Sequence, residues 1–214
     1  MANKATVVSV NVAIPTMVRV QNKVVLTSIF KTPVEGRVAV RRHNIEGDRQ
    51  ADLTVHGGPH KAVYCYPEEH YVFWSDQLPD TKLVFGNFGE NLTTRGLTED
   101  VVQIGDQFRV GSAILQVTQP RMPCYKLGIR FGRADMVKRF WRSERPGIYF
   151  SVVEEGDLAA GDAIEKVAGV PDGISVADVV ALYKGTKQNP GLMERALAAP
   201  LFGGWKQGLR ERRI

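Results

Sequence analysis

The chain is poor in cysteine: Cys65 and Cys124 are the only two thiols in 214 residues. They lie far apart in the sequence and form no C-x-x-C pair, which argues against a zinc ribbon and against a disulfide framework. This cysteine usage fits a reducing compartment. A chain of this length can fold around its own hydrophobic core as one large domain, or as one domain with a small addition.

The sequence also lacks an N-terminal leader pattern and a long apolar run. Residues 1–6, MANKAT, pass directly into a β-branched stretch. No segment approaches the roughly 18 apolar residues of a membrane span. We therefore expect a cytoplasmic protein with no membrane partner, in which the sequon at 91–93 has no meaning for glycosylation.

A strong charge bias is absent as well. The net charge is +5, from 28 basic and 23 acidic residues, and the basic residues are spread along the chain. The densest cluster, 210–213, is interrupted by Glu211 and is typical of a solvated helix end. We predict no nucleic-acid partner, because a pocket for a phosphorylated small molecule explains the modest positive excess equally well.

What the sequence does contain is a series of short β-branched runs separated by Pro, Asn and Gly, which predict strands. The segment 101–118, with turns at Gly105 and Gly111, is expected to form an antiparallel meander with Phe108, Val110, Leu115 and Val117 at alternating positions. The other predicted strands are 7–12, 17–20, 23–30, 36–40, 62–66, 147–153 and 163–167.

Helices are predicted where apolar residues recur at helical spacing and where capping residues begin them. Ser175 and Asp178 form a capping box at the start of one of them. The predicted helices are 67–76, 134–141, 176–183, 192–199 and a last one after Pro200. The last three cannot bury much surface by themselves and should pack on the β-rich unit or on a partner.

A polar, glycine-punctuated segment at 45–60 is a candidate ligand loop. Loops of about this length are usually functional or disordered, and three apolar residues within it argue against disorder. Gly57 and Gly58 would allow backbone amides to approach a ligand, with polar contacts from Arg49, His56, His60 and Lys61. Lys31 precedes a proline turn and either binds an anion or faces water. Residues 90–91 are either turn formers or pocket groups.

The strongest chemical signal is the stretch VTQPRMPCYK at 117–126. This stretch is predicted to be the end of a strand followed by a loop. Pro120 and Pro123 have no backbone N–H to donate, which disfavours ladder pairing there. Cys124 is thereby held between Arg121 and Lys126, and nearby positive charge favours the thiolate, which is both the nucleophile and the metal ligand. The alternative from local sequence is a buried, inert cysteine near a turn.

Taken together and in order, six motifs resemble those of the MOSC domain family, specifically its bacterial stand-alone branch with a three-helix C-terminal extension. The resemblance runs from about residue 31 to 167 and implies a mainly β fold, a mostly antiparallel β-barrel at 1–168, with a three-helix extension at 169–214. The motifs are KTP (31–33), GDRQAD (47–52), HGG (56–58), FGENL (88–92), IGD (104–106) and QPRMPC (119–124).

The resemblance further implies that the barrel holds the molybdenum cofactor, Mo-molybdopterin, with Cys124 as catalytic residue and protein ligand to molybdenum. A soft thiolate suits such a metal. Arg121 could add a charge-assisted hydrogen bond to the pterin phosphate. Positions matching family residues that look onto the pterin and its phosphate are Lys31, Thr32, Arg49, His56, Gly57, Gly58 and Asn91.

The activity implied by the resemblance is reduction of N-hydroxylated compounds, such as N-hydroxylated purine bases, to amines in detoxification. The sequence shows no flavin, haem or iron–sulfur signature, so electrons are expected from a separate reductase. Two alternatives stay open: a sulfur-transfer or cofactor-carrier protein with a persulfide on Cys124, and a non-catalytic binding module. A monomer and a homodimer are both compatible with the sequence.

Overall fold

The computed structural model describes residues 4–52 and 57–212, and its strands form one large sheet with two small ones. The strands are β1 Thr6–Val12, β2 Thr16–Val20, β3 Lys23–Thr27, β4 Thr32–Pro33, β5 Val38–Arg41, β6 Asn44–Ile45, β7 Val63–Pro67, β8 Leu92–Arg95, β9 Gln107–Val110, β10 Ala113–Pro120, β11 Ile148–Glu154, β12 Gly156–Leu158 and β13 Ile164–Ala168. The helices are the 3-10 turn η1 Pro59–Lys61, then α2 Glu69–Gln77, α3 Tyr125–Phe131, α4 Met136–Arg142, α5 Val176–Lys184, α6 Pro190–Ala198 and α7 Gly203–Glu211.

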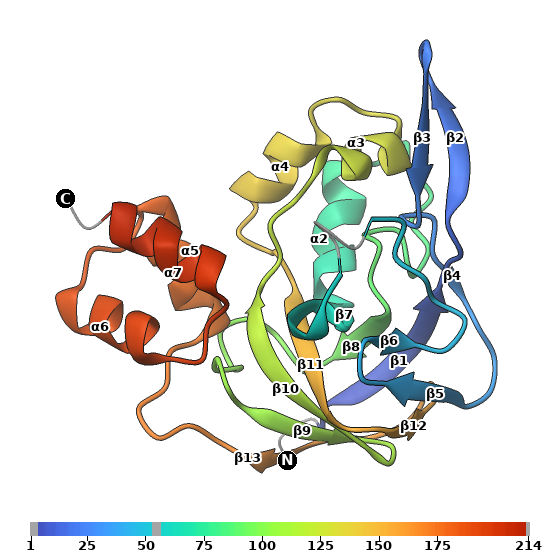
Figure 1. The fold of residues 1–214 in the computed structure, drawn as a ribbon. Helices are drawn as coiled ribbons and strands as arrows, with labels where there is room; N and C mark the ends of the chain where they lie inside the picture. Colours follow the sequence, from blue (N-terminus) through green and yellow to red (C-terminus); the bar gives the residue numbers. More distant parts are fainter. Residues whose placement is uncertain (1–3, 53–56, 213–214) are drawn as a thin grey trace.

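The large sheet has the strand order β13-β9-β10-β11-β7-β8-β1-β4. Its neighbours pair antiparallel except β7 and β8, which run parallel. A parallel pair needs a crossover connection, and α2 with the loop after it supplies this connection (Figure 1). The crossover returns the chain to the end of the sheet at which β7 begins, so the start of β8 lies beside the start of β7.

The two ends of the large sheet approach each other without completing a ring of paired strands. Backbone hydrogen bonds run from Val7 N–H to Asp162 O (2.9 Å) and from Gly161 N–H to Val7 O (2.8 Å). Ladder pairing among the described residues leaves β13 and β4 as edges. The predicted sheet-dominated fold with several helices is confirmed, whereas a closed barrel is not seen in the strand pairing.

Several local predictions need correction. Pro120 is the last residue of β10 and pairs with Ile148 of β11, because a proline at a strand end gives up only one ladder donor. Residues 101–104 do not form a first strand of the meander: they are irregular, and Gln103 makes an isolated bridge to Ser175. The elements that were not predicted include α3, directly after Cys124, and β8, directly after Asn91, together with the short β6, β12 and η1.

The core consists of two clusters of buried side chains. One is aromatic, built around Tyr66, Trp74, Phe88 and Phe140, and lies between α2, α4 and β7. The other is mostly aliphatic and extends from the sheet into the last three helices, where Trp205 is 4% exposed.

The three C-terminal helices lie side by side against one flank of the sheet (Figure 1). The predicted cap of α5 is present, since Ser175 Oγ accepts a hydrogen bond from Asp178 N–H (3.0 Å). Asn189 caps α6 in the same way, accepting from Leu192 N–H (3.0 Å). Among the described residues, every helix is too short or too polar to cross a bilayer.

Candidate functional site

A cleft opens beside Cys124, where β3, β7, β11 and the start of α3 meet. The space between its walls and across its open mouth, solvent included, is about 650 Å³. Its walls come from stretches that lie far apart in the sequence. The lining residues are Thr27, Ser28, Ile29, Lys31, Asp48, Gln50, Ala51, Lys61, Tyr64, Gly89, Asn91, Arg121, Met122, Cys124, Lys126 and Tyr149.

Cys124 lies at the position that precedes the first turn of α3, with an extended backbone (φ −123°, ψ 168°). Its side chain is partly exposed and faces the cleft, whereas Cys65 is buried at 2% exposure. Burial raises the pKa of the Cys65 thiol, with a smaller effect of the Glu90 carboxylate. The two cysteines therefore differ in role, because only Cys124 can reach a ligand in the cleft.

A buried network of three side chains forms one wall of the cleft. Lys31 Nζ donates to Asp48 Oδ1, and both side chains are almost inaccessible to solvent. Asp48 Oδ2 accepts from Asn91 Nδ2 (2.9 Å), while Oδ1 also accepts from Ala13 N–H (2.9 Å). Burial lowers the pKa of Lys31, and the Asp48 carboxylate opposes this effect.

The Lys31 ammonium group has hydrogen-bond donors beyond the one that it gives to Asp48. An ammonium group carries three N–H donors, and Asp48 is its one hydrogen-bond partner among the described residues. Because Lys31 lines the cleft, its remaining donors are available to a ligand.

Two further cations line the cleft without a carboxylate partner in the described chain. Arg121 is 5% exposed; its Nη1 donates to the Phe88 carbonyl, and its guanidinium lies 4.7 Å from the centre of the Tyr64 ring. Lys126 is 8% exposed and has neither an ion pair nor a side-chain hydrogen bond among residues 4–52 and 57–212. Buried charges are normally paired, so these two cations indicate an anionic ligand.

Aromatic side chains complete the walls. Tyr64 and Tyr149 line the cleft with their ring centres 5.0 Å apart. Burial raises the pKa of both phenols, opposed by the nearby Arg121, so both carry their protons at neutral pH. The Tyr64 hydroxyl donates to the Pro146 carbonyl (2.7 Å). The parallel pairing of β7 and β8 locks Tyr64 to Asn91, whose N–H donates to Tyr64 O (2.8 Å).

The structure brings four of the predicted site residues into the cleft: Lys31, Asn91, Arg121 and Cys124. Two others, Arg49 and Gly58, line a neighbouring open pocket that shares Gln50 with the cleft.

The remaining three predicted residues fall elsewhere. Thr32 is exposed in β4, where it pairs with Val12 on the edge of the sheet, and it lines neither pocket. Gly57 is likewise absent from both linings. His56 lies outside the described residues.

Sequence reasoning missed Asp48, Tyr64 and Tyr149. The signal for Asp48 was available, since it sits within the GDRQAD motif at 47–52. The two tyrosines stand in apolar strand sequence and give no such signal. Glu90, taken as either a turn former or a pocket group, is fully buried behind the cleft, where its carboxylate accepts from Tyr71 Oη, Gly86 N–H and Thr93 Oγ1.

The residues present fit a large anionic cofactor that carries a soft metal. A reachable thiol supplies a soft ligand, and Lys31, Arg121 and Lys126 surround it with positive charge. In addition, the Ser28 Oγ atom is buried in the cleft wall without a hydrogen-bond partner in the described chain. A sheet with such a cleft has the features of a site for an anionic small molecule or cofactor.

Comparison with known proteins identifies the family. Residues 52–165 match the MOSC domain, and the chain belongs to the MOSC domain family. It is similar to YflK of Bacillus subtilis, with 41% identity over 209 residues, covering 97% of this chain and 94% of YflK.

A solved structure and a longer relative complete the comparison. The crystal structure of YiiM from Geobacillus stearothermophilus matches with a TM-score of 0.80 and 32% identity, covering 98% of this chain and all of that one. A protein of Gibberella moniliformis named "Reductase" is 29% identical over 180 residues, which span 83% of this chain and 32% of that longer protein.

Proposed function

We propose that this protein binds the molybdenum cofactor in the Cys124 cleft and reduces N-hydroxylated compounds to amines. The observation that carries the proposal is a partly exposed thiol surrounded by buried cations, two of which have no carboxylate partner in the described chain. Membership of the MOSC domain family supports the cofactor, and the relative named "Reductase" supports the reaction class.

Each side chain of the cleft has a role in this proposal. Cys124 supplies the protein sulfur ligand, and Arg121 and Lys126 neutralise the anionic part of the cofactor with charge-assisted hydrogen bonds. Lys31 adds a third cation, which Asp48 holds in place. Lys31 and Asn91 were predicted as cofactor-binding residues, and Asn91 acts here through Asp48.

The bound cofactor would supply the two-electron redox chemistry, and the protein would bind, orient and desolvate the substrate. The overall reaction consumes two electrons and two protons, breaks the N–O bond and releases an amine and water. Among residues 4–52 and 57–212, no group of three or more His, Cys, Asp or Glu side chains could hold a metal ion. A single protein sulfur beside a cofactor that brings its own ligands is consistent with this arrangement.

The test compares two cysteine variants of protein produced in a host that makes the cofactor. We expect Cys124→Ala to lose bound molybdenum and to lose reduction of hydroxylaminopurine by an artificial electron donor. Cys65→Ala is the matched control and should keep both, because that thiol is buried away from the cleft.

The same preparations separate the proposal from sulfur transfer. Sulfane sulfur on Cys124 in protein without molybdenum would favour the carrier function. Bound molybdenum without turnover would contradict the reductase function while leaving the cofactor site in place.

Two proposals about architecture accompany the function. We propose that residues 1–168 act as a barrel whose seam is held by the hydrogen bonds between β1 and residues 161–164. The segment 169–214 would serve as a three-helix extension that packs on this barrel, which its contribution to the shared apolar core supports. We also propose that the protein functions in a reducing cytoplasm, which its two free cysteines support.

A further inference from the structure

The positive charge of this chain is concentrated beside the cleft. Residues 121–145 contain eight basic and two acidic side chains, so the other residues hold 20 basic and 21 acidic ones. Basic residues do occur along the whole chain, as expected, but acidic residues balance them everywhere except in this segment. The whole positive excess lies in the segment that begins with the Cys124 loop and includes α3 and α4.

Much of this charge faces solvent on one helix. Lys138 and Arg142 are exposed and have no ion pair or side-chain hydrogen bond among the described residues. They stand four residues apart in α4 and therefore on one face of the helix. Arg133 and Arg139 flank them and share a single carboxylate, Asp135. We call these four cations the basic face.

An apolar groove runs along the basic face and reaches the cleft. Met122 and Pro123 form its end nearest Cys124, Val137 and Trp141 of α4 form one side, and Tyr183 of α5 forms the other. Met122 lines the groove and the cleft alike. A molecule seated in this groove would thus be separated from the cleft by the Cys124 loop alone.

We propose that the basic face and its groove are the docking site of an acidic electron-donor protein with a flavin or iron–sulfur centre. This inference rests on the proposed reductase function. An apolar strip with a charged rim is the anatomy of a protein–protein interface, and a positive rim attracts an acidic partner. A nucleic-acid interface is more polar throughout, so the Trp141 and Tyr183 groove favours a protein.

A donor protein bound at this site would supply the electrons that the reaction consumes. Each turnover takes two electrons and two protons, and the donor protein is oxidised as the N-hydroxylated substrate is reduced. The donor can deliver the electrons singly in two encounters or as a pair. Substrate reaches the cleft by its open mouth, so donor and substrate need not compete for one surface.

The experiment uses cofactor-loaded protein with two probes, an acidic flavodoxin and an acidic [2Fe–2S] ferredoxin. We expect at least one of them to support turnover, with kcat/KM falling as salt rises. The double variant Lys138→Glu/Arg142→Glu should lower this kcat/KM by about tenfold or more at low ionic strength. Turnover with saturating reduced viologen should stay within about twofold of the parent, because that donor needs no docking surface.

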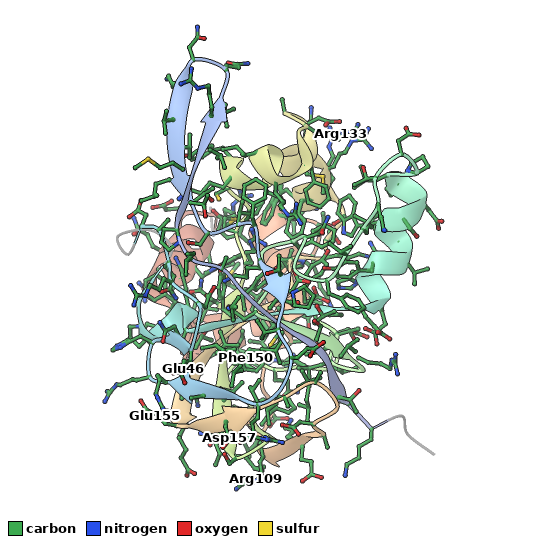
Figure 2. The ribbon with its side chains drawn as sticks, turned by 90° about the vertical axis from the view of Figure 1, so that its right-hand side faces the viewer. Glu46, Arg109, Arg133, Phe150, Glu155 and Asp157 are labelled. Carbon is green, nitrogen blue, oxygen red and sulfur yellow. The ribbon has the colours of Figure 1, made fainter. Side chains whose placement is uncertain are left out.

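The control variant is Arg109→Glu. Arg109 is exposed on β9 at the end of the molecule opposite Arg133, as Figure 2 shows. Like each of the two substitutions in the double variant, Arg109→Glu replaces a positive charge by a negative one. It should leave both assays unchanged.

The outcomes distinguish the two proposals. Failure with viologen as well as with both proteins refutes the proposed function. Turnover with viologen but with neither protein refutes the docking site alone. The docking site is also refuted if the double variant has the same kcat/KM for the donor protein as the parent. An oligonucleotide whose binding falls in the double variant, with donor kinetics unchanged, would assign the basic face to nucleic acid and overturn the inference.

Discussion

The ion pair between Lys31 and Asp48 offers the sharpest test of how the cleft is held together. The perturbation is Asp48→Asn, which removes the charge and keeps the size. Asp48 accepts from Lys31, from Ala13 N–H and from Asn91 Nδ2. An asparagine cannot accept from all three, and its amide nitrogen would meet another donor.

The magnitude follows from burial. Both side chains are at most 8% exposed, and removing one partner of a buried pair costs about 3–5 kcal/mol. A second substitution, Lys31→Met, removes the ammonium charge that Asp48→Asn leaves unpaired and keeps a side chain of similar volume. The double variant should therefore recover most of the loss, with a coupling energy of about 2 kcal/mol or more.

The pH dependence has a definite sign. Burial already lowers the pKa of Lys31 below its ordinary 10.5, and loss of the opposing Asp48 carboxylate lowers the pKa further. Folding of Asp48→Asn then releases a proton, so its stability should rise with pH between the lowered pKa and 10.5. The double variant has no Lys31 and should lack this rise.

The assay is urea unfolding followed by tryptophan fluorescence at several pH values. Glu165→Gln is the control, since its pair with Lys4 is exposed and should contribute no measurable stability. Equal unfolding free energies for the parent and Asp48→Asn would refute the reasoning. So would a double variant whose loss is the plain sum of the two single losses.

Three further predictions concern the surroundings of the cleft. Iodoacetamide should label the native protein once, at Cys124, and label Cys65 only after unfolding; mass spectrometry of the labelled peptides decides this. Glu90→Gln should cost about 2–4 kcal/mol in urea unfolding, because an amide presents a donor to groups that all donate to this buried carboxylate. Gly86→Ala should cost about 2–4 kcal/mol, since its φ is +89° and a Cβ would lie 2.7 Å from the Lys31 carbonyl oxygen. Gly185→Ala, with φ +75° and open space around it, should cost only about 1 kcal/mol.

Local sequence patterns predicted much of the fold. Alternation in residues 107–118 placed Phe108, Val110, Leu115 and Val117 in the core, and all four are buried. The capping box at Ser175 and the helices after it were also found. These features depend on neighbours in the sequence, which is why a pattern can reveal them.

What sequence reasoning could not supply is contact between distant segments. Nothing in the sequence of β7 indicates a parallel partner. The contact between Tyr64 and Asn91 depends on that pairing and therefore could not be predicted. The partner of Lys31 was equally hidden, because Asp48 is 17 residues away in a polar loop. The burial of Arg121 and Lys126 could not be predicted from the sequence either. The rings that cover Arg121, Tyr64 and Phe140, come from other elements.

The spread of the cleft along the chain has a consequence for how the protein is made. Its walls extend from Thr27 to Tyr149, and β11, which carries Tyr149, pairs with both β7 and β10. A nascent chain that ends before β11 therefore has no complete cleft. Loading of any cofactor must therefore follow synthesis of β11, and a truncated translation product that stops earlier would be unable to retain it.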